Sequence, residues 1–169
     1  MPTKLTTTIS KIACIPNSVN SELVNNFYEY MKSNGASERH QNNNLKVVIA
    51  YAKFLGPDVS LYDIQKKEQI IEFLDTKIKN AEIDPDKKWI TTWNHNLHRI
   101  KHFFRWLHNW KLKDTEGDNE SQISEWETPT FAQIKKKKTK RLSPYLESEI
   151  WDRDELSQAI MKILNYRYL

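Results

Sequence analysis

Glycine and cysteine are scarce in this 169-residue chain, and their scarcity narrows the fold classes open to it. The chain has three glycines. A sheet with many tight hairpins needs more, because glycine most easily adopts the positive φ angles of such turns. Helices are therefore favoured. Cys14 is the one cysteine, which excludes an intrachain disulfide and a zinc site built on several cysteines.

Two further absences concern the location of the protein. No stretch approaches about 18 apolar residues, the length that a membrane-spanning helix needs. Residues 1–15 lack the charged-then-apolar pattern of a signal peptide. We therefore expect a soluble, cytoplasmic protein without a membrane partner, which would be nucleoid-associated when bound to DNA.

Patterns for catalysis and for metal binding are missing as well. The chain has no glycine-rich phosphate loop, no GxSxG motif and no HExxH motif. His95, His98 and His102 share helical spacing, but no carboxylate or cysteine nearby completes a set of metal ligands. We expect no catalytic residue, no metal, no cofactor and no small-molecule substrate.

The chain is rich in the three- and four-residue apolar spacing of amphipathic helices, with six tryptophans and six phenylalanines to fill a core. The expected fold class is all-α. Ser37 is placed to cap a helix, and Gly35 and Gly56 are placed to end helices. Four helices are expected over residues 21–34, 37–55, 67–80 and 85–110, with a short turn at 60–64. The third helix should turn Ile78 inward.

Composition divides the chain into four parts. Residues 1–20 are rich in threonine, serine and asparagine and are expected to form an irregular arm before the helical bundle of residues 21–112. An acidic, polar stretch is followed by a run of basic residues that ends at Arg141. Such sequences do not build a core, so residues 113–141 are expected to be a linker. Residues 142–169 contain a terminal helix that starts near Arg153, with Asp152 as its cap.

The fourth helix has the clearest apolar face in the sequence. Its spacing places these residues on one buried seam: Trp93, Leu97, Ile100, Phe104 and Leu107. Tryptophans at such spacing can stack on unpaired bases, but they more often belong to a core, and Trp93 is expected to be core. Trp106 is expected to point away from the seam, toward a partner surface.

The polar side of the same helix carries a row of cations, and no Asp or Glu occurs from residue 87 to residue 113. A phosphate backbone is bound by such a row, with short polar side chains between the cations. A similar row lies on the second helix. The alternative is a solvated basic face that binds nothing. The DNA-binding candidates are Arg39, Asn43, Lys46 and Lys53 on the second helix, and Lys87, Lys88, Thr91, Asn94, His98, Lys101 and Arg105 on the fourth.

The basic run in the expected linker has three interpretations: a nuclear-localisation-like patch, a nucleic-acid tether, or solubilising charge. Its position between a basic helical domain and a further helix favours the tether. The run adds these residues to the DNA-binding candidates: Lys135, Lys136, Lys137, Lys138, Lys140 and Arg141.

The order of these features resembles a known family. The segments "SELVNNFYEYMKSNGAS", "NNNLKVVIAYAKFLG", "SLYDIQKKEQIIEFLDTKI" and "WITTWNHNLHRIKHFFRWLHNW" are similar to the four-helix SAM-like core-binding domain of tyrosine recombinases and phage-type integrases. The segment "SPYLESEIWDRDELSQAI" is similar to the start of the catalytic domain in archaeal-type integrases. The resemblance implies that the second and fourth helices face duplex DNA, and that a basic linker follows the backbone.

The chain departs from that family in its catalytic residues. The family cleaves DNA with a tyrosine assisted by two arginines, a histidine and usually a lysine, and none of these is matched here. Tyr145, Tyr166 and Tyr168 match the wrong region to be the nucleophile. The resemblance therefore implies a non-enzymatic part of a recombinase, with residues 142–169 as the truncated start of the catalytic domain.

Two functions from different classes follow. The first is duplex DNA binding in site-specific recombination and DNA integration, with other recombinase protomers on the DNA as further partners. The second is a helical protein-interaction adaptor whose basic face meets an acidic partner. Retention on DNA at physiological salt distinguishes them.

Overall fold

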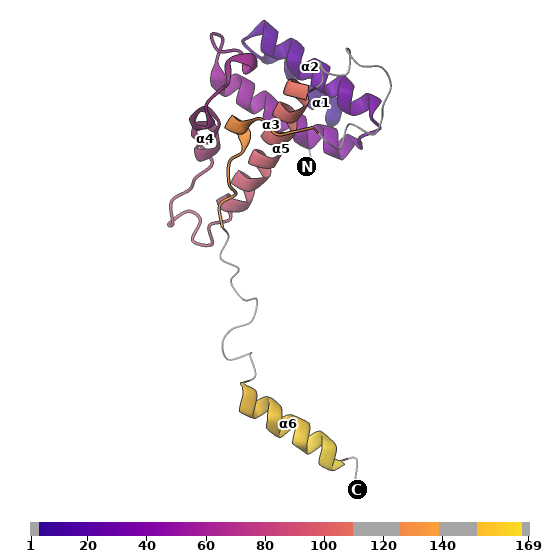
Figure 1. Ribbon diagram of the computed structural model, residues 1–169, viewed down its shortest axis with the longest axis vertical. Coiled ribbons are helices and arrows are strands. Elements are labelled where there is room, and N and C mark those ends of the chain that lie inside the picture. The colour runs from indigo at the N-terminus through magenta and orange to yellow at the C-terminus, as the bar shows by residue number, and fades with distance from the viewer. Residues whose placement is uncertain (1–3, 110–125, 139–151, 167–169) are drawn as a thin grey trace. The chain divides into compact units, whose positions relative to one another are not determined.

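The computed structural model describes residues 4–109, 126–138 and 152–166, and the chain forms two compact units, residues 1–138 and 139–169. No strand occurs within these described ranges, which confirms the all-α class. The first unit contains helices α1 (Leu5–Ser10), α2 (Ser18–Ser33), α3 (Glu38–Leu55), α4 (Lys67–Asp75) and α5 (Trp89–Asn109) (Figure 1). Short 3-10 turns lie at Ile12–Cys14, Leu61–Asp63 and Thr130–Ala132. The second unit contains α6 (Arg153–Tyr166).

Local signals fix the ends of α2 and α3 largely as the sequence predicted. The Ser37 side chain accepts a hydrogen bond from the His40 backbone N–H and so caps α3. Gly35 and Gly56 follow the two helices with φ angles of 68° and 78°, which side chains with a Cβ rarely adopt. The start of α2 lies a few residues earlier than expected, because Asn17 caps it by accepting from the Asn20 N–H at 3.0 Å.

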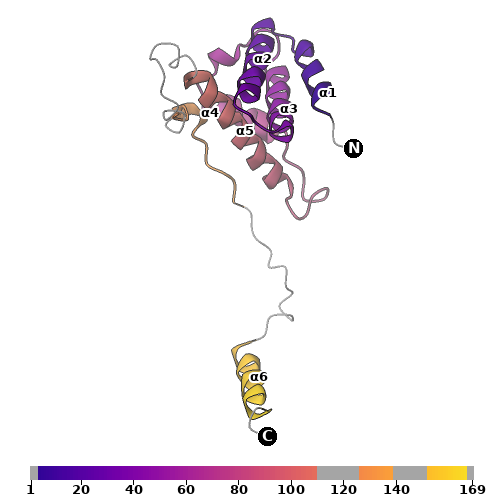
Figure 2. The same cartoon turned by 90° about the vertical axis from the view of Figure 1, so that its right-hand side faces the viewer.

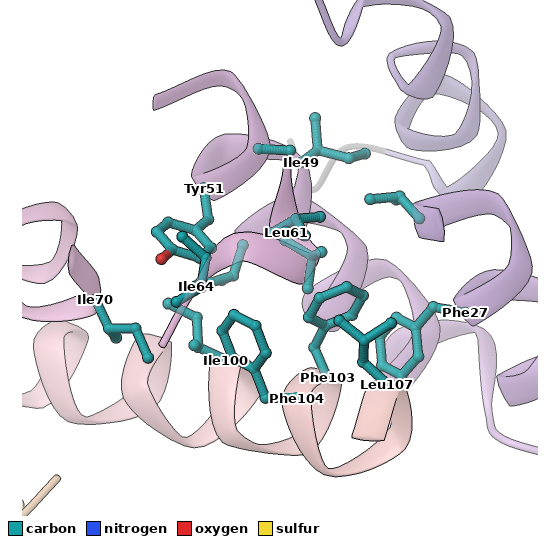
Figure 3. Packing of buried hydrophobic residues seen from close by; sticks show 14 of the residues in the cluster. Phe27, Ile49, Tyr51, Leu61, Ile64, Ile70, Ile100, Phe103, Phe104 and Leu107 are labelled. Carbon is teal, nitrogen blue, oxygen red and sulfur yellow. The ribbon is translucent and has the colours of Figure 1, made fainter. Parts of the chain in front are cut away.

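The core forms around α5, whose predicted apolar seam is fully buried. Figure 3 shows Ile100, Phe103, Phe104 and Leu107 of α5 facing the other helices. Phe27 of α2 meets Phe103 edge to face, with ring centroids 5.2 Å apart. Such pairs add to the stabilisation from burial alone, so α5 is the helix around which the others pack.

The expectation of an irregular arm over residues 1–20 is wrong. Residues 5–10 form α1, which packs against α3, and Ile12 and Ile15 are buried in the common core. The buried Thr8 hydroxyl donates to the Asn42 side-chain oxygen of α3 at 2.6 Å. Threonine has low helix propensity, so tertiary contacts rather than local preference hold α1 in place. Figure 2 shows α1 beside α3 at one side of the unit.

The boundaries between α4 and α5 also differ from the prediction. Helix α4 ends at Asp75 rather than residue 80, and Ile78, predicted to point inward, is 44% exposed. Residues 85–88 do not belong to α5, because Lys87 has a φ of 52°. The Asp84 carboxylate instead accepts from the backbone N–H groups of Lys88 (3.0 Å) and Trp89 (2.8 Å), where the helix dipole favours an anion.

Part of the predicted linker belongs to the first unit. We call residues 126–138 the strap, because this segment returns along α5 (Figure 1). Ala132 and Ile134 are buried, and Phe131 packs edge to face on Phe104 with centroids 5.1 Å apart. The Trp126 ring stacks on Tyr30 of α2 at 5.7 Å. The rest of that predicted linker, 113–125 and 139–141, lies outside the described residues.

Trp106 was predicted to face a partner, and this prediction is wrong. Its side chain is 2% exposed and packs against the rings of Phe27, Tyr30 and Phe103. The seam of α5 is therefore wider than the strict three-and-four spacing indicated.

In the second unit, α6 begins as the sequence predicted. The Asp152 carboxylate accepts from the N–H groups of Asp154 (2.7 Å) and Glu155 (2.8 Å) and so caps the helix. Within α6, Leu156, Ile160 and Met161 are exposed apolar side chains.

A buried asparagine joins α2 to the turn after α3, and this generates a stability prediction. The Asn20 side chain, fully buried, donates to the Val59 carbonyl at 2.9 Å and accepts from the Leu61 N–H at 2.8 Å. Asn20→Ala leaves both backbone groups unpaired, so we expect the free energy of unfolding to fall by about 2–4 kcal/mol in urea melts. Asn26→Ala, at an exposed position of the same helix, should change it by less than about 0.5 kcal/mol. Equal effects would contradict the bonding role.

Candidate nucleic-acid interface

A hollow of about 340 Å³ lies between α3 and α5, on the helix pair that the sequence predicted to face DNA. Asn43, His98, Lys101 and Arg105, four of the predicted DNA-binding residues, line it together. Four residues that the sequence reasoning did not choose complete the lining: His40, Asn44, Arg99 and His102. No described residue lining this hollow is acidic, so it is a concave, cationic surface suited to an anion.

The packing of α3 on α5 holds the histidines of this hollow together. The rings of His40 and His102 meet edge to face with centroids 5.6 Å apart. Phe27 of α2 lies against the other side of His102 at 5.4 Å. The His102 Nδ1 atom lies 3.3 Å from the Asn44 side-chain oxygen, while the Asn44 amide nitrogen donates to the His40 carbonyl at 2.8 Å.

Burial, together with neighbouring positive charges, lowers the pKa values of two histidines of the hollow. Burial, followed by the charges of Lys136, Arg105 and Arg99 and the nearby His40, lowers the pKa of His98. Burial, with smaller contributions from His40, His98 and Arg105, lowers the pKa of His102 to about 4.

The pKa of Lys101 is lowered by the same causes. Burial contributes most, and the charges of Lys136 and Arg105 add to it. Burial is thus the main cause of these depressed pKa values, and the neighbouring cations add a repulsion that a bound anion would relieve.

A second hollow of about 590 Å³ adjoins the first and shares Lys101 and Arg105 with it. The strap forms the rest of its lining: Glu127, Thr128, Gln133, Ile134 and Lys135. Glu127 is the one acidic residue in this lining. The two hollows form a surface that runs from α3 across α5 to the strap.

Much of the polar stripe predicted on α5 is used to hold the strap. The Asn94 side chain exchanges two hydrogen bonds of 2.9 Å with the backbone of Lys137. The Lys101 ammonium donates to the Ile134 carbonyl at 2.7 Å, and the Arg105 guanidinium donates to the Thr128 hydroxyl at 2.9 Å. Lys101 and Arg105 also line the hollows, whereas Asn94 lies outside both linings.

The side chain of Lys137 adds a second set of contacts that hold the strap. Its ammonium lies 3.1 Å from the Asp75 carboxylate of α4 and over the rings of Trp89 and Trp93, 5.0 Å and 4.8 Å from their centroids. The Trp93 indole N–H donates to the same Asp75 carboxylate at 2.9 Å. Lys137 was predicted to bind DNA, and the structure places its side chain in these contacts within the protein.

The other predicted residues lie outside the two hollows. Arg39, Lys46 and Lys53 are exposed on α3, and neither hollow includes them. Lys87 and Lys88 are exposed just before α5, Thr91 is exposed in its first turn, and Lys88 pairs with Asp86 at 3.0 Å. On the strap, Lys136 and Lys138 are exposed beside the lining residue Lys135. Lys140 and Arg141 lie outside the described residues.

The DNA-binding candidates chosen from the sequence did not include His40, Asn44, Arg99 and His102. A partial signal existed for His102, which follows His98 by one helical turn. The signal for His40 and Asn44 was weaker, because their relation to α5 depends on how two helices pack.

Comparison of the chain with protein-family models, with curated proteins and with solved structures gives no match. Within the described ranges, no helix has both the length and the apolar character needed to cross a membrane. The same ranges contain no group of three or more histidine, cysteine, aspartate or glutamate side chains placed to hold a metal ion.

The position of Lys137 predicts that one side chain holds the strap. We expect Lys137→Gln to lower the free energy of unfolding by about 1–2 kcal/mol, because it removes a partly exposed ion pair and the cation–π contacts with two indoles. Trypsin should then cut within residues 126–138 faster than in the native protein.

Lys138→Gln is the matched control, since this neighbouring lysine is exposed and its replacement removes the same charge and one trypsin site. Equal protease sensitivity in both variants would show that Lys137 does not anchor the strap.

Proposed function

We propose that residues 4–138 form a duplex DNA-binding module, with α3, α5 and the strap as its DNA-facing surface. The observation that carries the proposal is the meeting of the two hollows at Lys101 and Arg105: α5 and the strap line them with cations, and α3 adds a histidine and two asparagines. Cations spaced over a rigid concave surface displace counterions from a phosphate backbone, and that displacement supplies much of the affinity of DNA-binding proteins.

The placement of the aromatic residues favours duplex over single-stranded DNA. A single-strand binder needs exposed aromatic faces on which bases can stack. Trp93 and Trp106 are buried, and Lys137 lies over the ring of Trp89. Among the described residues that line the two hollows, histidine is the one aromatic type, and no Phe, Tyr or Trp is included. Recognition is therefore proposed to rest on phosphates and polar side chains.

The recombinase assignment rests on the resemblance in sequence order and on the cationic hollow between α3 and α5. We propose that this unit is a SAM-like core-binding domain, acting in site-specific recombination and DNA integration, and that α6 belongs to the start of a catalytic domain. Because the resemblance matches no residue here to the family's nucleophile or arginines, this chain is proposed to bind DNA without cleaving it.

The first test removes charge from the strap. We expect Lys135→Gln with Lys136→Gln to weaken binding to a mixed-sequence duplex about tenfold at 0.1 M salt. The slope of log affinity against log salt should fall by about 0.9 for each phosphate that the protein no longer neutralises. Fluorescence anisotropy over a salt series measures both quantities, and circular dichroism checks the fold.

Lys11→Gln with Lys67→Gln removes the same charge at exposed positions beside α1 and on α4 and should change the slope little. Equal weakening by both pairs would indicate diffuse attraction by net charge and contradict the assigned surface. Displacement of the duplex by poly-glutamate at matched charge would instead favour an acidic protein partner.

Catalysis is tested separately with supercoiled DNA. We expect the 169-residue chain to leave the DNA uncut and to form no covalent adduct, because a phosphotyrosyl bond requires the activated nucleophile that the resemblance does not place here. A protein–DNA band that survives denaturing electrophoresis would overturn the non-enzymatic assignment.

A further inference from the structure

Three of the five histidines in the chain converge on the hollow between α3 and α5. His40 comes from α3, and His98 and His102 come from successive turns of α5. A cationic row along a helix does not require histidine, since lysine and arginine hold their charge at every physiological pH. Histidine is the side chain whose charge changes in that range, so its concentration here needs a separate explanation.

The hydrogen bonds around His102 determine which ring nitrogen carries its proton. The Asn44 amide nitrogen donates to the His40 carbonyl, so the Asn44 oxygen is the atom left to accept from His102. His102 Nδ1 therefore carries the hydrogen in the neutral ring, and Nε2 is unprotonated. Donation from Nε2 to an anion requires the ring to take up a second proton.

Every charged group described around these histidines is a cation or another histidine. Arg99, Lys101 and Arg105 share α5 with His98 and His102, His40 faces them from α3, and Lys136 acts from the strap. From α2, the ring of Phe27 packs on His102 and carries no charge. Burial and these surrounding charges lower the pKa values of His98 and His102 in the free protein, and an anion that enters the hollow would favour protonation.

We propose that this hollow, which we name the histidine seat, receives a phosphate group of the DNA backbone and takes up protons as it does so. The inference rests on the proposed function and deepens it. The seat has room for a phosphate, and polar side chains on two helices can hold it. The unprotonated nitrogen of His102 becomes a hydrogen-bond donor when the ring takes up a second proton. DNA affinity is then coupled to pH through the seat.

Whether DNA affinity rises or falls with pH follows from the linkage between proton uptake and DNA binding. Bound phosphate raises the histidine pKa values above those of the free protein, so the complex holds more protons and affinity rises as pH falls. The limit is about tenfold for each pH unit and each proton taken up. For the intact chain and a mixed-sequence duplex at constant ionic strength, we expect affinity to rise about tenfold or more between pH 7.5 and pH 5.5.

The variant that tests the seat is His40→Gln with His98→Gln, at exposed positions where glutamine should leave the fold intact. It should reduce the pH-dependent gain to about twofold. His102→Gln should also reduce the gain, with a thermal melt to check folding. The matched control is His95→Gln with His108→Gln, exposed on the same helix and outside the seat, which should keep the full gain.

A second readout identifies the protonated groups. The imidazole proton resonances of His40, His98 and His102 should titrate at higher pH in the DNA complex than in the free protein, and those of His95 should shift less. An equal pH gain in both double variants, or histidine titrations unchanged by DNA, would overturn the seat while leaving DNA binding intact. Absence of DNA binding at any pH would overturn the proposed function itself.

Inorganic phosphate distinguishes a backbone phosphate from a free one. We expect 10 mM phosphate (roughly a hundredfold above the protein) to shift the histidine titrations less than the duplex does, because it cannot reach the strap at the same time. Equal shifts with phosphate, and no competition between phosphate and duplex, would assign the seat to a free anion and overturn the backbone assignment.

Discussion

The Lys137 ammonium has the Asp75 carboxylate at 3.1 Å and the faces of Trp89 and Trp93 beneath it. This arrangement holds the returning chain against α5, and the rest of the surface depends on it. Lysine suits the position because its stem packs on the indoles while its charge reaches the carboxylate. Because Lys137 is fixed, the neighbouring residues Lys135 and Lys136 lie at the edge of the hollows and do not belong to an unattached linker. A basic run thereby becomes part of a folded surface, and binding to it requires less ordering of the chain.

Helix α5 has two roles: one face packs in the core, and the other contacts the strap and the hollows. Its seam packs against α2, α3 and α4, while Asn94, Lys101 and Arg105 hold the strap and the last two also line the hollows. The hydrogen-bond partners lower the conformational freedom of these long side chains, so less entropy is lost when a phosphate binds. The cost is electrostatic: burial, and after it the neighbouring positive charges, lowers the pKa values of His98 and Lys101. An anion is the partner that removes this cost.

The parts of the fold that were predictable have local causes. The seam through Trp93 and Leu107, the serine cap of α3 and the glycines after α2 and α3 each depend on a few neighbouring residues. The strap and α1 were not predictable in this way. Threonine-rich α1 is held by its packing on α3, and the strap by a small number of apolar side chains such as Phe131 and Ile134 among charged neighbours. In both segments the stabilising partners are distant in sequence, so composition indicated an arm and a linker.

The candidate site shows a limit of predicting contacts from the spacing of residues along a helix. Spacing placed His98, Lys101 and Arg105 on one polar face, but it could not show whether solvent or another segment lies against that face. Trp106 illustrates the same limit, since a helix packed among several others is buried over more of its circumference than a surface helix. A polar face on such a central helix must meet something polar. Here part of the polar face of α5 meets the backbone of the strap. The rest of that face lines the two hollows, where an outside anion can enter. The function proposed for α5 therefore follows from its central position in the fold.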